Sequence, residues 1–206
     1  MGLSHCCLCT TKTNLMKNNR YGQAKVLTTQ ELDLTIDNIS SKLHRTIAST
    51  LRNTGARVGE VVQLKWQDLE EESILFPKTI TKRKLKSREI FISNKFHNEL
   101  MLWKQEWTLF KGREPLPEDY IFYGRFNGTH IQSRSFMYAL ESAFKRAQIK
   151  KGSTHSFRRS MLSKLHKNNI PLNVIKSLSG HSNLQTLSLY LQVDDDDKRN
   201  AIAHLA

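Results

Sequence analysis

The chain has 206 residues, a length that favours one domain, or one domain with a small appendage. Lys and Arg total 32 against 19 Asp and Glu, so the formal net charge is +13. Such a charge attracts polyanions, which makes nucleic acid or an anionic membrane surface the leading class of partner. No apolar run approaches the ~20 residues of a membrane-spanning helix, and a membrane partner is therefore disfavoured.

Residues 1–27 are predicted to form a basic leader. All three cysteines, Cys6, Cys7 and Cys9, lie within it, so no disulfide scaffold can hold the rest of the chain together. The segment lacks the apolar stretch of a secretory signal, which favours a cytoplasmic, nucleoid-associated protein. Structural zinc takes four ligands, and beside His5 and these cysteines no second pair of ligands is present, so we predict no metal site.

Three short helices are predicted next. Thr28, with Glu31 three residues later, forms a capping-box pattern that opens the first helix. Apolar residues at helical spacing predict a second helix, which ends at Gly55. A third, short helix leads from Val58 toward Trp66.

Residues 74–76 and 90–92 are apolar and predict the two strands of an antiparallel hairpin. Between the strands, six basic residues occur within eleven positions, and no acidic residue interrupts them. They are Lys78, Lys82, Arg83, Lys84, Lys86 and Arg88. Charge of one sign at a turn favours contact with DNA phosphates, which position a protein but carry no sequence information.

The middle of the chain predicts a long helix, a strand and another helix. Trp103 and Trp107 mark the long helix as part of the core. A short strand is predicted over residues 120–123. An apolar stripe from Phe136 to Ala147 then predicts the next helix.

The last third is predicted to be helical. Helices are expected over residues 155–167 and 172–178, the second ended by Gly180, and Ser182 is expected to cap a final segment that includes Tyr190. The fold class that follows is mainly α with a small antiparallel β-sheet (α+β).

Residues suited to phosphoryl transfer concentrate in this last third. His155 and Arg158 share one face of a helix, and Tyr190 follows His181 by nine residues. Arginine forks bind phosphate and neutralise charge that develops on it, as Arg57 upstream could also do. A tyrosine is a nucleophile once neighbours activate it, and a histidine or lysine can donate a proton. Together, the tyrosine, the arginines and the histidines indicate metal-free phosphoryl transfer through a tyrosine.

The chain resembles the catalytic domain of the tyrosine recombinase/phage integrase family. The segment 54–69 resembles the first arginine box of the family, and 155–159 resembles its H-x-x-R box. Residues 179–181 together with Tyr190 resemble its G-H…Y box, and the boxes follow one another in the family order. The resemblance implies the tyrosine recombinase catalytic-domain fold, with that domain over residues 28–206.

The resemblance also implies a role for each matched residue. Tyr190 would attack the scissile DNA phosphate and form a 3′-phosphotyrosine link with a free 5′-hydroxyl. Arg57 and Arg158 would hold the phosphate oxygens. His155 would assist proton transfer at the tyrosine, and His181 would hydrogen-bond the phosphate. Because the phosphotyrosine conserves the bond energy, rejoining would need no metal, no ATP and no other cofactor.

The family also uses a lysine in the hairpin turn as the acid for the leaving 5′-oxygen. Its usual position, five residues before Arg88, is occupied here by Arg83, with Lys82 and Lys84 on either side. We predict Lys82 as this acid and keep Lys84 as the alternative, because an arginine does not give up its proton. Glu60 would support the active-site arginine without doing chemistry.

One departure from the family concerns the N-terminal core-binding domain, which clamps the opposite DNA face. Only about 27 residues precede the first predicted helix, so we expect this domain to be absent. The chain is then either a catalytic fragment of a longer recombinase or a naturally minimal one. Half of the phosphate contacts would be missing in both cases, which lowers DNA affinity and site selectivity.

The function that follows is site-specific recombination of double-stranded DNA. We predict a monomer in free solution and a homo-tetramer on DNA, with the tail Asn200–Ala206 exchanged between neighbours. Arg159 is predicted to be a further DNA contact or a structural contact. Two alternatives stay open: a DNA-binding module that keeps the fold but does not recombine, and a topoisomerase-like enzyme that relaxes DNA.

Overall fold

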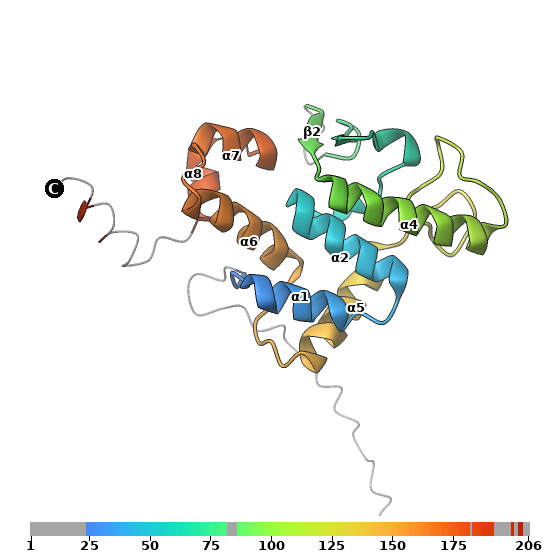
Figure 1. Ribbon diagram of the computed structural model, residues 1–206, viewed down its shortest axis with the longest axis horizontal. Helices are drawn as coiled ribbons and strands as arrows, with labels where there is room; N and C mark the ends of the chain where they lie inside the picture. Colours follow the sequence, from blue (N-terminus) through green and yellow to red (C-terminus); the bar gives the residue numbers. More distant parts are fainter. Residues whose placement is uncertain (1–23, 82–85, 182, 192–198, 200–201, 204–206) are drawn as a thin grey trace, which may run out of the picture.

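The computed structural model describes residues 24–81, 86–181, 183–191, 199 and 202–203. It is mostly helical and contains one two-stranded antiparallel sheet, which confirms the predicted fold class. Helix α2 (Lys42–Thr54) lies at the centre of the molecule (Figure 1). Its neighbours are α1 (Thr29–Asp37), α4 (Asn94–Lys111), α5 (Ser133–Arg146) and α6 (Thr154–Lys167). In the parts of the chain described here, no helix is long and apolar enough to cross a bilayer.

The first helices begin and end where the local chemistry predicts. The backbone N–H of Glu31 donates to Thr28 Oγ1 at 3.1 Å, and the N–H of Thr28 donates to Glu31 Oε2 at 3.0 Å, so the capping box of α1 is confirmed. Gly55 ends α2 in the left-handed conformation with φ +59°. The short helix α3 (Val58–Val61) and a single 3₁₀ turn at Trp66–Asp68 follow.

The predicted hairpin is also confirmed. Strands β1 (Ser73–Phe76) and β2 (Arg88–Phe91) pair antiparallel, with Ile74 opposite Ile90. Successive side chains of a strand point to opposite faces. In β2 the inward face carries Arg88 and Ile90, which are both buried.

The strand predicted over residues 120–123 is wrong. Tyr120 and Tyr123 form only isolated bridges, to Lys65 and His130 respectively. The indole N–H of Trp107 donates to the carbonyl of Tyr120 at 3.1 Å, and the N–H of Ile121 donates to the carbonyl of Leu64 at 2.9 Å, so the segment pairs its backbone with scattered partners instead of one strand.

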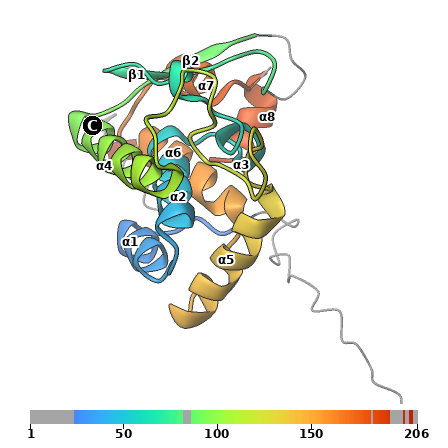
Figure 2. The ribbon, with the colours of Figure 1, turned by 90° about the vertical axis from the view of Figure 1, so that its right-hand side faces the viewer.

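Two hydrophobic clusters build the core, and α6 joins them. The larger cluster runs from Leu27 to Phe157, and the smaller one is centred on Leu162, Ile175 and Leu187. The smaller cluster belongs to α6, α7 (Leu172–Ser179) and α8 (Leu184–Ser188), and α7 also packs beside β2, as Figure 2 shows. The boundary between the two clusters is where the candidate site lies.

The start and the end of α8 differ from the prediction. The N-cap is Asn183, whose side-chain oxygen accepts from the N–H of Thr186 at 2.7 Å, whereas Ser182 lies outside the described residues. Tyr190 lies in the turn that follows α8 rather than within a helix. Its carbonyl accepts from Ser163 Oγ at 3.3 Å, which ties the turn to α6.

Candidate active site

Arg57 and Glu60 form the first part of the site, in the tight turn between α2 and α3. Arg57 is the N-cap of α3 and Glu60 is the third residue of that helix. The Glu60 carboxylate accepts from the backbone N–H of Arg57 at 3.1 Å and from its Nη1 at 2.8 Å. One carboxylate therefore holds both the main chain and the guanidinium of Arg57, whose side chain remains 25% exposed.

Arg88 was predicted to contact a DNA phosphate from the hairpin turn, but the structure places its side chain in the interior. It is buried, its Nη2 donates to Glu60 Oε2 at 2.9 Å, and its Nη1 lies 3.4 Å from the carbonyl oxygen of Ser179. The physical reason is the alternation of β2, which turns Arg88 inward with Ile90. The sequence carries this signal in the period-two spacing of these two residues.

Glu60 consequently stands between two guanidinium groups. Its own burial raises the pKa of Glu60, but the charge of Arg88 and the hydrogen bonds from Arg88 and Arg57 outweigh that effect. The net result is a pKa of about 2 for Glu60, so its carboxylate is ionised at neutral pH. Its role is to hold two cations in place.

Arg158 is the most buried charged side chain of the site, at 1% exposure. Its Nη1 donates to the carbonyl of Gly55 at 2.7 Å, and its Nη2 donates to the carbonyl of Ser179 at 2.5 Å. Its buried Nε has no hydrogen-bond partner in the described structure. Burial and the nearby positive charges lower the pKa of Arg158 to about 10, which still leaves the guanidinium protonated at pH 7.

His181 packs against Arg158 and is also buried. Its Nδ1 lies 2.7 Å from Ser179 Oγ and its Nε2 lies 3.4 Å from Arg158 Nη2. Burial, followed by the charges of three neighbouring arginines, lowers the pKa of His181 to about 4. The imidazole is therefore neutral at pH 7 when no anion is bound.

Tyr190 joins this group from the turn after α8. Its ring centroid lies 4.9 Å from that of His181, and Arg158 Cζ lies 5.7 Å from the same Tyr190 centroid. The side chain is half-buried and packs on the small hydrophobic cluster. A phenol, a neutral imidazole and a buried guanidinium thus meet at one place.

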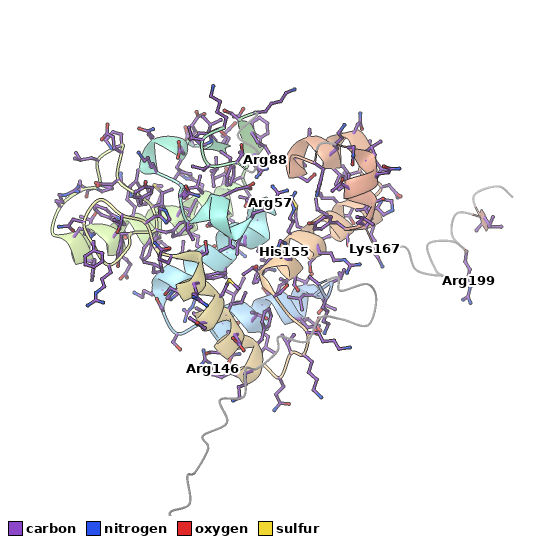
Figure 3. The ribbon with its side chains drawn as sticks, turned by 180° about the vertical axis from the view of Figure 1, so that it is seen from behind. Arg57, Arg88, Arg146, His155, Lys167 and Arg199 are labelled. Carbon is purple, nitrogen blue, oxygen red and sulfur yellow. The ribbon has the colours of Figure 1, made fainter. Side chains whose placement is uncertain are left out.

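His155 lies in the first turn of α6 and is exposed. It lines a cavity of about 360 Å³ together with Arg57, Glu60 and Arg158. Figure 3 shows Arg57, Arg88 and His155 gathered near the junction of α3, β2 and α6, with Arg146 and Lys167 further away. Three guanidinium groups and a single carboxylate give this junction a positive charge, which suits a phosphate.

The predicted lysines and Arg83 belong to the hairpin turn between β1 and β2. Lys82, Arg83 and Lys84 lie outside the described residues, while Lys78 and Lys86 are exposed on the two sides of the hairpin turn.

Arg159 makes a structural contact, which is one of the two roles predicted for it. It is half-buried, and its Nη1 donates to the carbonyl of Ala24 at 2.5 Å. This bond ties the segment before α1 to α6.

Ser179 contacts the candidate site, but the sequence analysis assigned it no role. Its carbonyl orients Arg158 and its hydroxyl meets His181. Its position directly before Gly180 and His181 was the available signal. Among the described residues, no group of three or more His, Cys, Asp or Glu side chains is placed to hold a metal ion.

Gly180→Ala is expected to destabilise the protein more than Gly112→Ala. Both glycines end helices with positive φ, so each alanine costs about 1 to 2 kcal/mol of backbone strain. A Cβ on Gly180 would lie 2.6 Å from Arg88 Nη1, whereas a Cβ on Gly112 would meet nothing within 4 Å. Displacing the buried Arg88 adds about 1 to 3 kcal/mol. Urea unfolding measures both, and equal losses would contradict the close approach.

Comparison with known proteins identifies the family of the chain. The family model described as "Phage integrase family" matches residues 25–197. Tyrosine recombinase XerC of Caldanaerobacter subterraneus is 23% identical over 159 residues, which are 76% of this chain and 43% of that protein. The chain spans about half the length of the curated relatives it matches.

Two solved structures share the fold. The crystal structure of XerA recombinase aligns with a TM-score of 0.72 and 22% identity, over 87% of this chain and 64% of that one. The XerH site-specific recombinase bound to a difH substrate aligns with a TM-score of 0.67 and 24% identity, over 86% of this chain and 53% of that one.

Proposed function

Since this chain belongs to the phage integrase family, we propose that it is a site-specific tyrosine recombinase that cuts and rejoins double-stranded DNA. The Oη of Tyr190 attacks the scissile phosphorus, and the bond from phosphorus to the 5′-oxygen breaks. A 3′-phosphotyrosine and a free 5′-hydroxyl result. Rejoining is the reverse attack by a 5′-hydroxyl, and it needs no ATP, metal or other cofactor because the phosphotyrosine retains the energy of the broken bond.

The observation that carries the proposal is the meeting of Tyr190, Arg158 and His181. Arg158 reaches back to Gly55, 103 residues earlier, so the turn that holds Arg57 is tied to the same guanidinium. Two arginines at one phosphate neutralise the charge that develops on its non-bridging oxygens.

The two histidines take separate roles in this proposal. His155 lines the cavity beside Arg57 and assists proton transfer at the tyrosine. His181 hydrogen-bonds the phosphate beside Arg158. Glu60 is a positioning residue, because both of its oxygens are engaged by arginines and it has no free role in proton transfer.

Lys82 is proposed as the acid for the leaving 5′-oxygen, with Lys84 as the alternative. Loss of the acid is expected to slow cleavage about 10²- to 10⁴-fold. A substrate with sulfur in place of the bridging 5′-oxygen leaves as a thiolate without an acid, so it should restore cleavage to the variant that lost the acid. Comparing Lys82→Ala with Lys84→Ala on both substrates identifies the residue; rescue of Lys84→Ala alone would overturn the assignment to Lys82.

The proposed partner is double-stranded DNA, contacted through its phosphates by Lys78, Lys86, Arg83 and the other turn lysines. On DNA we propose a homo-tetramer that exchanges the tail Asn200–Ala206, and in free solution a monomer. Deleting the tail should weaken assembly on two sites and spare cleavage of a single site. We propose that the protein is associated with the nucleoid, where the DNA that it acts on is located.

Covalent trapping tests the proposed chemistry. The full chain is mixed in EDTA with labelled suicide duplexes that tile the DNA flanking its own gene. An SDS-resistant adduct, with the nucleotide located on Tyr190 by peptide mass spectrometry, is the expected result. Clear DNA binding without any adduct would instead favour a binding module that does not recombine. Strand exchange between two sites separates a recombinase from a topoisomerase-like enzyme.

A further inference from the structure

Ser179, the last residue of α7, lies in the box of residues 179–181, but the resemblance to the family assigns it no role. The residue is 2% exposed. Its hydroxyl donates to the carbonyl of Lys176 at 3.1 Å and lies 2.7 Å from His181 Nδ1. A serine hydroxyl has a single proton. Since that proton goes to Lys176, the oxygen accepts from His181, and the ring proton of His181 lies on Nδ1.

The contact on the other side of the ring is compatible with this tautomer. His181 Nε2 lies 3.4 Å from Arg158 Nη2. A guanidinium only donates hydrogen bonds, so Nε2 faces it with its lone pair. The short contact with Ser179 therefore sets the tautomer with the proton on Nδ1, and the longer contact with Arg158 is compatible with it.

The main chain of Ser179 acts on the same group of residues. Its carbonyl accepts from Arg158 Nη2 at 2.5 Å, and Arg88 Nη1 approaches it at 3.4 Å. Gly180 follows in the left-handed conformation and turns the chain so that His181 comes back beside Arg158. One residue therefore orients the buried guanidinium through its carbonyl and the imidazole through its hydroxyl.

We propose that Ser179 is a positioning residue that holds His181 in the Nδ1–H tautomer, with the Nε2 lone pair facing the phosphate site. This inference deepens the proposed function and rests on it for its catalytic consequence. Phosphate oxygens only accept hydrogen bonds, so His181 must take up a proton on Nε2 before it can donate to the phosphate. Ser179 accepts from Nδ1–H in both the neutral and the protonated ring, and its bond survives that step.

The charged surroundings explain why this proton uptake depends on the bound DNA. His181 faces Arg158 from α6, Arg57 from the start of α3, Arg88 from β2 and the ring of Tyr190. Without an anion, burial and then the three cations lower the pKa of His181 and disfavour the imidazolium, and a bound phosphate offsets the charge of the cations. Cleavage by the wild type should therefore decline on the alkaline side, as His181 in the complex loses its proton.

Ring-nitrogen NMR of the full chain tests the tautomer without DNA. With ¹⁵N-histidine labelling, long-range ¹H–¹⁵N correlations show which ring nitrogen carries the proton, and His181→Gln identifies the signal. We expect Nδ1–H in the wild type and in Ser179→Thr, and a shift toward Nε2–H in Ser179→Ala. Ser177→Ala, which removes an exposed hydroxyl from the same helix, should leave the spectrum unchanged. A wild-type proton on Nε2, or an unchanged tautomer in Ser179→Ala, overturns the proposal.

Single-turnover cleavage then tests the consequence. Ser179→Ala should cleave about 10-fold more slowly at pH 7, because the ring is no longer held, and Ser179→Thr should restore the rate. Its alkaline limb should move to higher pH, since a neutral Nε2–H ring can donate without protonation. A purely structural loss would lower the rate at every pH without moving that limb. The absence of any adduct in the wild type would refute the proposed function and leave the NMR result standing.

Discussion

Tyr190→Phe is expected to remove the covalent DNA adduct completely while the affinity for DNA stays unchanged. Phenylalanine keeps the ring that packs on His181 and on the small hydrophobic cluster, and it lacks only the attacking oxygen. Affinity for DNA comes mainly from Lys and Arg contacts with phosphates, which this change leaves intact. Gel analysis of SDS-resistant adducts measures the loss, and binding at several salt concentrations measures the affinity.

The matched control is Tyr138→Phe on α5. This substitution also removes one phenol oxygen, but from a side chain that is 60% exposed. It should form adduct at the wild-type rate. Persistence of the adduct in Tyr190→Phe would mean that another side chain attacks the phosphate. Peptide mapping of that residual adduct would then identify the nucleophile.

Glu60→Gln is expected to lower the free energy of unfolding at pH 7 by about 3 to 5 kcal/mol, the cost of removing one partner from a buried ion pair. The Glu60 carboxylate accepts hydrogen bonds from both Arg57 and Arg88. In Glu60→Gln one of its oxygens is replaced by an NH₂ group, which donates and therefore cannot accept from a guanidinium. The typical total stability of a protein is about 5 to 15 kcal/mol, so the loss is a large part of it. Urea unfolding followed by circular dichroism measures this change.

The pH dependence of stability gives an independent readout of Glu60. Its pKa falls from 4.5, its ordinary value, to about 2 in the folded protein. The stabilisation from this depressed pKa is complete above pH 4.5 and is lost as the pH falls through 2. It amounts to about 3 kcal/mol. The free energy of unfolding of the wild type should fall by this amount as the pH is lowered through that interval. In Glu60→Gln this contribution should be missing, because the glutamine does not titrate.

Glu89→Gln controls for the change in net charge, because Glu89 neighbours Arg88 on β2 and faces outward. We expect its free energy of unfolding to stay within about 0.5 kcal/mol of the wild type, as is usual for exposed positions. A loss in Glu89→Gln as large as that in Glu60→Gln would contradict the assigned role of Glu60.

The sequence by itself determined the features that depend on a few neighbouring residues. The capping pair Thr28 and Glu31 begins α1, and Gly55 and Gly180 end α2 and α7, because caps and left-handed turns are set by local sterics and local hydrogen bonds. The hairpin and the amphipathic helices follow from periodicity for the same reason. The candidate nucleophile and arginines were identified because they occur in segments that resemble the boxes of the phage integrase family.

Only the tertiary structure decided how the distant charges pair. Glu60 meets Arg88 across 28 positions, and Arg158 meets Ser179 across 21. No local pattern encodes these contacts, since they exist only after α7 has packed on α6 and β2 and Arg88 has reached Glu60. For that reason the sequence analysis assigned Arg88 to the DNA surface and gave Ser179 no role. In the fold, burial makes each unpaired charge costly, and that cost selects the partners that are observed.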